Sequence, residues 1–204
     1  MKTPEQQTIA SYDRYAKEFA KYYDRQQGWK KETLLFKRLL PGGNVLDIGC
    51  GSGRDTKRLF QSGFTVTAMD PSKKMLEIAR KKSPRAAFVK KEALQIDFQK
   101  DSFDGFWAAN VLLHIPKKRI RLVLKKIWRV IRPNGIGMIS VKKGDSEKLE
   151  EYSSTIGKKA PRLFSYYPAV TFQKLLKKSG FSVIKKYAPG HFPNGAVFFV
   201  RVKK

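Results

Sequence analysis

Between residues 44 and 141, short apolar runs alternate with segments of helical periodicity, and this alternation constrains the fold more than any other feature of the chain. The apolar runs predict strands over 44–48, 65–69, 86–89, 103–108 and 136–141. The periodic segments predict helices over 54–61, 72–82 and 117–131. Strands that alternate with helices through short connections form a parallel sheet with helices on both faces.

The segments on either side of this alternation complete the expected domain. Before it, periodicity predicts helices over 5–23 and 29–39, ended by the Pro-Gly-Gly at 41–43. After it, a helix over 171–179 precedes strands over 181–187 and 196–202, whose short connection predicts an antiparallel pair at a sheet edge. We therefore expect one α/β domain over 1–204, with a helical cap (1–40) and a sheet-containing core (41–204).

Several classes of protein are excluded by what the sequence lacks. No apolar run approaches the roughly 18 residues of a membrane span, and the polar segment 1–24 does not resemble a secretory signal. The single cysteine, Cys50, allows no internal disulfide and no multi-cysteine metal site. We expect a cytoplasmic protein with no metal and no membrane partner.

The charge of the chain is strongly positive. Lys and Arg total 43 against 17 Asp and Glu, which gives a net charge of +26. No acidic residue occurs over 105–144 or over 152–204. Such a field attracts nucleic acids and steers anionic small molecules, but a run of lysines is also typical of a solvated surface. The helical segment 117–132, rich in Lys and Arg around Trp128, is open to both interpretations.

A glycine-rich loop follows the first predicted strand, at the edge of the sheet where parallel α/β proteins bind ligands. Gly49, Gly51 and Gly53 permit positive φ angles and let the backbone approach a ligand closely. The helix after them offers unpaired N–H groups. Asp70 ends the next strand, where a carboxylate can accept hydrogen bonds from both hydroxyls of a ribose.

The spacing of this loop excludes two common nucleotide sites. A dinucleotide fingerprint needs glycine at its sixth position, which is Arg54 counted from Gly49 and Thr56 counted from Gly51. No Lys-Ser/Thr pair follows, so a phosphate-cradling P-loop is excluded as well. Asp47, just before the glycines, would repel phosphate but attract the ammonium of an amino-acid moiety.

These residues resemble a known family. The segment 45–56 is similar to motif I of the class I S-adenosylmethionine-dependent methyltransferases, and 67–76 is similar to the acidic motif that follows it. The segments 88–93, 102–116 and 130–135 resemble the later motifs in the same order, with Glu92 where Asp is usual and Asn134 in place of a glycine. The segment 12–19 resembles the N-terminal helix that covers the cofactor in many members.

A narrower likeness is also visible. The segments 53–56, 141–145 and 164–167, with the strand around Trp107, resemble a bacterial subgroup of tellurite-resistance-like and small-molecule methyltransferases. The family resemblance implies a Rossmann-like, seven-stranded, mostly parallel sheet of strand order 3-2-1-4-5-7-6, with the last strand antiparallel. It also implies the cofactor S-adenosyl-L-methionine.

The resemblance and the positions of the motifs give the candidate site residues. The expected cofactor-binding residues are Asp47, Gly49, Gly51, Gly53, Asp70, Pro71, Met75, Glu92, Ala93, Ala109 and Phe19. The expected substrate pocket is formed by Tyr15, Trp107, Asn110, Tyr166 and His191. His114, on the loop after the fourth strand, is the candidate general base because an imidazole titrates near neutral pH.

Some of these residues have a second interpretation. Trp107 is equally suited to the core, Tyr12, Tyr15 and Phe19 are suited to a packing stripe, and Cys50 is expected to pack beside the cofactor rather than to act as a nucleophile. The predicted function is methyl transfer to a small-molecule acceptor by in-line displacement, by a monomer or homodimer. The alternatives are an RNA methyltransferase that uses the basic surface and a non-catalytic cofactor-binding protein.

Overall fold

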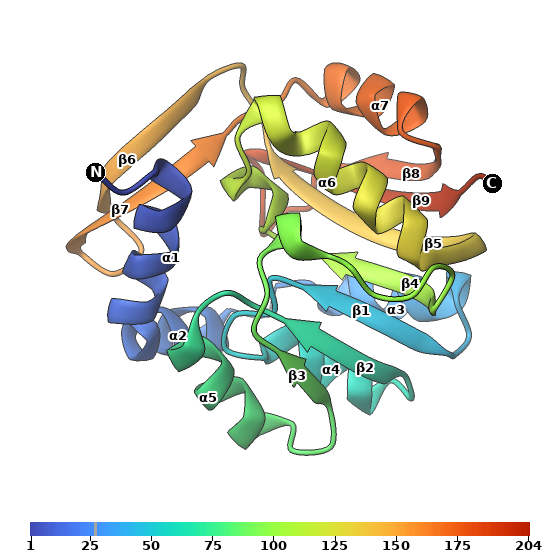
Figure 1. The fold of residues 1–204 in the computed structure, drawn as a ribbon, viewed down its shortest axis with the longest axis horizontal. Helices are drawn as coiled ribbons and strands as arrows, with labels where there is room; N and C mark the ends of the chain where they lie inside the picture. Colours follow the sequence, from blue (N-terminus) through green and yellow to red (C-terminus); the bar gives the residue numbers. More distant parts are fainter. Residues whose placement is uncertain (27) are drawn as a thin grey trace.

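The structure, a computed structural model, describes residues 1–26 and 28–204. Its centre is a seven-stranded sheet of order β3-β2-β1-β4-β5-β9-β8 (Figure 1). The strands are β1 (Asn44–Ile48), β2 (Thr65–Met69), β3 (Ala87–Val89), β4 (Phe103–Ala108), β5 (Ile131–Lys142), β8 (Phe181–Tyr187) and β9 (Gly195–Val202). The pairs among β1 to β5 are parallel, whereas β9 is antiparallel to both β5 and β8. This confirms the predicted order, because β8 and β9 are the predicted sixth and seventh strands.

Helices cover both faces of this sheet. They are α3 (Lys30–Leu39), α4 (Arg54–Gln61), α5 (Lys73–Lys82), α6 (Lys117–Val130) and α7 (Ala169–Lys178), with short 3-10 helices η1 (Ala93–Gln95) and η2 (Leu112–His114). Successive strand residues point to opposite faces, so Phe106 packs in the core beneath α6 and α7 whereas Trp107 packs in the core beneath α3, α4 and α5. The two cores fix the sheet, and with it the carboxyl ends of the strands.

The cap differs from the single N-terminal helix predicted over 5–23. It consists of α1 (Pro4–Arg14) and α2 (Ala16–Arg25), separated at Tyr15, whose φ of −110° and ψ of 32° lie outside the helical range. The chain therefore turns at Tyr15 without a proline or glycine to signal it. The two helices nevertheless share one apolar cluster, in which Tyr12 packs against Phe19.

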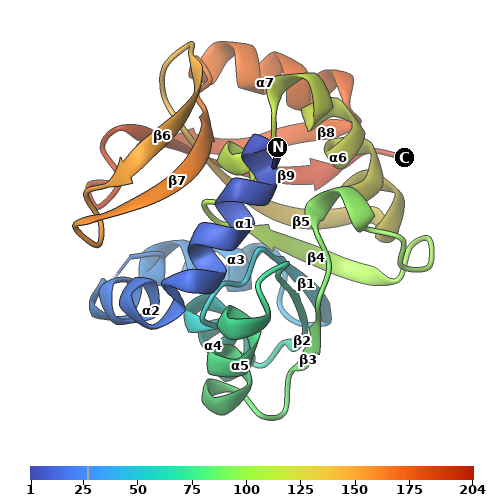
Figure 2. The ribbon, with the colours of Figure 1, turned by 60° about the vertical axis from the view of Figure 1, so that its left-hand side comes forward.

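A hairpin that we did not predict follows β5. It is formed by β6 (Glu147–Ser153) and β7 (Lys158–Ser165), and α1 lies along β7 (Figure 2). The Ser11 hydroxyl donates to the carbonyl of Pro161 at 2.8 Å, and the backbone N–H of Leu163 donates to the Thr8 hydroxyl at 2.8 Å. Helix and hairpin together form a wall beyond the carboxyl ends of the central strands.

One smaller difference concerns a boundary. The segment 133–135, expected to be a turn, lies within β5, which starts directly after α6 and shows a register irregularity against β4. Among the described residues, no helix has both the length and the apolar character needed to cross a bilayer.

Candidate active site

The glycine loop after β1 has the conformation that its sequence requires. Gly49 and Gly51 have φ angles of 69° and 54°, which L side chains rarely adopt. A Cβ on Gly49 would lie 2.5 Å from Cγ2 of Val111, whereas a Cβ on Gly51 would have no atom within 4 Å. Gly49 is therefore required for packing, and Gly51 exposes bare backbone to open space.

Asp70, at the end of β2, fixes this loop from the other side. Its two carboxylate oxygens accept backbone N–H groups from Gly51 and from Ser72, each at 2.9 Å. Burial raises the pKa of Asp70 to about 6, although these two hydrogen bonds act in the opposite direction. Each oxygen retains a lone pair that can accept a further donor.

A cavity lies at this edge of the sheet, between the loops after β1 to β4 and the inner face of α1. Of the predicted site residues, those that line it are Gly49, Gly51, Asp70, Pro71, Met75, Glu92, Ala93, Ala109, Asn110 and His114. The structure thus brings together residues from four loops that are distant in sequence. The described residues contain no cluster of three or more His, Cys, Asp or Glu that could hold a metal ion.

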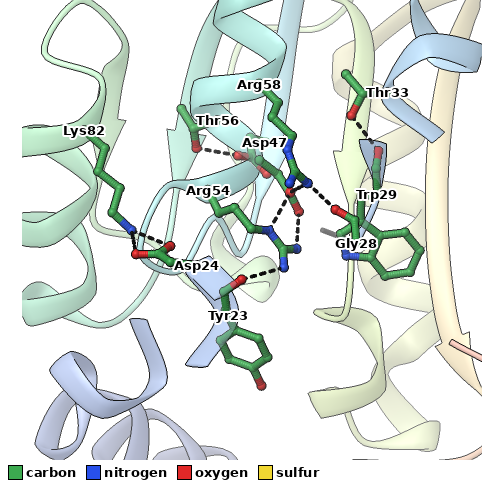
Figure 3. A network of polar contacts seen from close by, with 11 residues as sticks. Tyr23, Asp24, Gly28, Trp29, Thr33, Asp47, Arg54, Thr56, Arg58 and Lys82 are labelled. Carbon is green, nitrogen blue, oxygen red and sulfur yellow. Dashed lines mark hydrogen bonds and ion pairs between the residues drawn. The ribbon is translucent and has the colours of Figure 1, made fainter. Parts of the chain in front are cut away.

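Three predicted cofactor residues are not on the cavity wall. The Asp47 carboxylate is buried under the loop, where it accepts the Thr56 hydroxyl at 2.6 Å (Figure 3), and burial raises its pKa to about 7. Gly53 is the N-cap of α4 and packs against Ala79. Phe19 is fully buried, because it is packed among Tyr12, Tyr23 and the guanidinium of Arg162. These residues can act on a ligand only by supporting the loop or the cap.

Most of the predicted substrate pocket lies elsewhere. Trp107 is fully buried, with its ring centroid 5.5 Å from that of Phe36, because its strand position points it into the core. Tyr15 packs under the ammonium of Lys158. The Tyr166 hydroxyl donates to Glu150 at 2.5 Å, and His191 lies on the surface with its ring against Trp29. Within this group only Asn110 lines the cavity.

Sequence reasoning expected the segment 12–19 to cover the cofactor but missed the earlier residues of α1. Its face toward the cavity consists of Glu5, Thr8, Ile9 and Tyr12. These positions share one side of a helix because they are separated by three or four residues. That spacing, already present within the predicted helix over 5–23, could have identified them as one face. Cys50, which was expected beside the cofactor, also lines the cavity, and the other lining residues that we did not predict are Tyr23, Ser52, Arg54, Asp55, Ser72, Lys91, Leu94, Val111 and Ile115.

The predicted general base, His114, is held at both ring nitrogens. Nδ1 lies 2.6 Å from the carbonyl oxygen of Leu163, and Nε2 lies 2.9 Å from the Tyr12 hydroxyl. Burial lowers the pKa of His114 to about 3, and the nearby charges of Arg162 and Lys142 act in the same direction. The imidazole is therefore neutral at physiological pH and, in this arrangement, has no free nitrogen for an incoming proton.

A polar network attaches the cap to the glycine loop (Figure 3). The guanidinium of Arg54 pairs with both carboxylate oxygens of Asp55, at 2.9 and 3.0 Å, and donates to the carbonyl of Tyr23 at 3.2 Å. Arg58 donates to the carbonyl of Gly28. The start of α4 is thereby tied to the end of α2, which keeps Tyr23 and Arg54 at the cavity.

The chain is similar in sequence to known methyltransferases. Residues 45–135 match the model of a methyltransferase domain. The chain is 31% identical over 180 residues to the uncharacterized protein MJ1123 of Methanocaldococcus jannaschii, covering 85% of this chain and 82% of that protein. It is 32% identical over 119 residues to methyltransferase GfsG of Streptomyces halstedii, covering 54% of this chain.

The chain matches 42% of the length of GfsG, and 45% and 33% of two further methyltransferases, so it spans less than half of these relatives. The Burkholderia thailandensis 1,6-didemethyltoxoflavin-N1-methyltransferase, solved with S-adenosylhomocysteine, has the same fold, with a TM-score of 0.79 at 20% identity over 100% of this chain and 92% of that one. Residues 45–135 thus match a methyltransferase domain, and the sheet as a whole has the fold of this solved methyltransferase.

Proposed function

We propose that this protein binds S-adenosyl-L-methionine in the cavity beside Asp70 and transfers its methyl group to a small-molecule acceptor by in-line displacement. The observation that carries the proposal is the pairing of Asp70 with Gly51. A buried carboxylate, anchored by the backbone of a glycine loop at a cavity wall, is suited to accept the two hydroxyls of a ribose.

The other residues of the cavity fit the rest of this cofactor. Glu92 and Ala93 lie on the loop after β3, where a carboxylate and a backbone N–H suit an adenine edge. Gly49 and Gly51 leave space for close approach of the amino-acid part, and Asp47 supports them from below through Thr56. When bound, the cofactor supplies an electrophilic methyl group, so this chain has only to bind, orient and exclude water.

The shape of the site supports a small acceptor. The cavity is closed on one side by α1, which is itself fastened to β7. The Burkholderia thailandensis enzyme supports the same conclusion, because it was solved with the small molecule 1,6-didemethyltoxoflavin bound together with S-adenosylhomocysteine. His114 is not placed as a base, since both of its ring nitrogens are engaged. Membership of the tellurite-resistance-like subgroup stays a prediction.

RNA methylation is the second candidate, because α6 carries many basic residues and no acidic one. The apolar side of α6 packs in the core beneath the sheet, and the residues of α6 do not line the cavity. The helix is therefore better explained as a solvated face.

A labelling experiment separates the two candidates. The protein is incubated with cofactor carrying a deuterated methyl group, together with either a small-molecule cell extract or total RNA, and the products are analysed by mass spectrometry. We expect the label in a small molecule, and no label with the Asp70→Ala variant. Label in RNA, at a level that depends on salt, would instead support the second candidate.

A further inference from the structure

Three side chains from three separate segments form one directed chain of hydrogen bonds at the wall of the cavity. Arg162 of β7 donates from Nη1 to the Tyr12 hydroxyl of α1 at 3.3 Å, and that hydroxyl lies 2.9 Å from Nε2 of His114. A guanidinium can only donate and the carbonyl of Leu163 can only accept. Nδ1 of the neutral imidazole therefore carries the proton, and the Tyr12 O–H donates to Nε2.

The charge behind Tyr12 is not neutralised. Arg162 is only 5% exposed and, within the described part of the chain, no carboxylate lies within ion-pair distance of it. Its Nε has no hydrogen-bond partner, while Nη2 donates to Ser153 at 2.8 Å. The aromatic rings of Tyr12, Phe19 and Phe164 surround the guanidinium, at 5.6, 5.0 and 5.1 Å, and such contacts stabilise a buried cation without removing its charge.

This arrangement determines what Tyr12 can offer to a ligand. Its proton is committed to His114 and one N–H arrives from Arg162, so the hydroxyl oxygen can only accept a further hydrogen bond, for which a ligand competes with the neighbouring Tyr23 hydroxyl. A ligand cation would meet the uncompensated guanidinium behind the ring. Glu5, the acidic residue that α1 contributes to the cavity wall, is paired with Arg119 at 3.4 Å.

We propose that Tyr12 is an acceptor-positioning residue, and that the methyl acceptor is a neutral or anionic molecule whose O–H or N–H donates to the Tyr12 hydroxyl. This inference rests on the proposed function, because it needs the cofactor to occupy the neighbouring part of the cavity. Ile9, Val111 and Ile115, which line the cavity around Tyr12 and His114, provide apolar contacts for the rest of such a molecule.

Three probes that share a benzyl group test the proposal: benzyl alcohol, benzyl methyl ether and benzylammonium. Each is titrated into protein saturated with S-adenosylhomocysteine, and binding is followed by the ¹⁵N signals of the His114 ring. The exposed His191 gives the only other histidine signal and serves as a reference. We expect the alcohol to bind about fivefold more tightly than the ether or the ammonium, as for one net hydrogen bond, and to shift the Nε2 signal.

The Tyr12→Phe variant removes the hydroxyl but keeps the ring that packs against Phe19. The variant should lose the preference for the alcohol, because the hydrogen bond from the acceptor to the Tyr12 hydroxyl is gone. It should keep its affinity for S-adenosylhomocysteine within about twofold, because the proposed hydrogen bond is to the acceptor and not to the cofactor. Tyr22→Phe, at an exposed position, is the matched control and should behave as the wild type.

Each outcome is decisive. Equal binding of the three probes, tighter binding of benzylammonium, no binding of any probe to the loaded protein, or a preference that survives in Tyr12→Phe would overturn the proposal. Failure of the wild-type protein to bind S-adenosylhomocysteine would instead contradict the proposed function, and it is measured first.

Discussion

The Tyr12 hydroxyl lies 2.9 Å from Nε2 of His114, although the two residues are 102 positions apart in the sequence. One belongs to α1 and the other to η2, after β4. Their contact joins the cap to the loop that follows the fourth strand, at the wall of the cavity. It also keeps the imidazole in one tautomer. The contribution of His114 to the stability of the fold therefore depends on pH.

We expect His114 to stabilise the fold at neutral pH and to lose this effect in acid. Its pKa is lowered from 6.5 to about 3, so below pH 6.5 the unfolded chain takes up a proton that the folded chain does not. The difference in unfolding free energy between the wild type and His114→Gln should shrink as the pH falls from 6.5 towards 3. Urea denaturation across this range measures it. A difference that stays constant would show that the imidazole is not held neutral.

Asp47 should have the opposite pH dependence. Its pKa is raised from 3.8 to about 7, so between these values the folded chain holds a proton that the unfolded chain releases. Stability of the wild type should therefore fall relative to Asp47→Asn as the pH rises from 3.8 to 7. The amide can still accept the Thr56 hydroxyl, so the hydrogen bond is preserved. Parallel stability curves for the two proteins would argue that Asp47 is ionised throughout.

Gly49 allows a test of how tightly the glycine loop packs against Val111. Gly49→Ala places a Cβ at 2.5 Å from Val111 in a left-handed conformation and should destabilise the protein by about 1–3 kcal/mol. Gly42→Ala, where no atom lies within 4 Å and the φ angle is ordinary, is the control and should be neutral. Thermal unfolding compares them. Equal stability of the two variants would show that the loop can relax around an added methyl group.

Cys50 should contribute packing and no chemistry. It lines the cavity but is only 8% exposed, and burial raises the pKa of its thiol well above the usual value, so little nucleophilic thiolate is present. We expect Cys50→Ala to bind S-adenosylhomocysteine with nearly wild-type affinity and to retain most of its methyl transfer. A fall in turnover of more than about tenfold would indicate a direct role for the thiol in the reaction.

The sequence predicted the sheet well because its signals are local. The apolar runs of β1, β2 and β4 and the glycines after β1 are contiguous, so the strands and the ligand-binding edge followed from them, whereas the strand order came from the family resemblance. The hairpin β6–β7 was missed because β6 is a charged strand with mostly exposed side chains. It has no apolar alternation to detect.

Side-chain direction was the harder part of the site. Trp107 was expected near the cavity because it is close to the end of β4, but a shift of one residue along a strand reverses the face. Tyr15 and Phe19 were misplaced because the helix breaks at Tyr15, which no proline or glycine marks. Arg162 lies on the missed hairpin, so its contact with Tyr12 could not be anticipated.

The most direct test of the account is calorimetric titration of S-adenosylhomocysteine into the wild type, Asp70→Ala and Asp145→Ala. Asp145 is an exposed carboxylate that does not line the cavity and so controls for the loss of one charge. We predict that the wild type and Asp145→Ala bind alike. Asp70→Ala should remain folded but bind at least about a hundredfold more weakly, because it loses two hydrogen bonds to a charged acceptor. Unchanged affinity of Asp70→Ala would contradict the central claim that this carboxylate holds the cofactor.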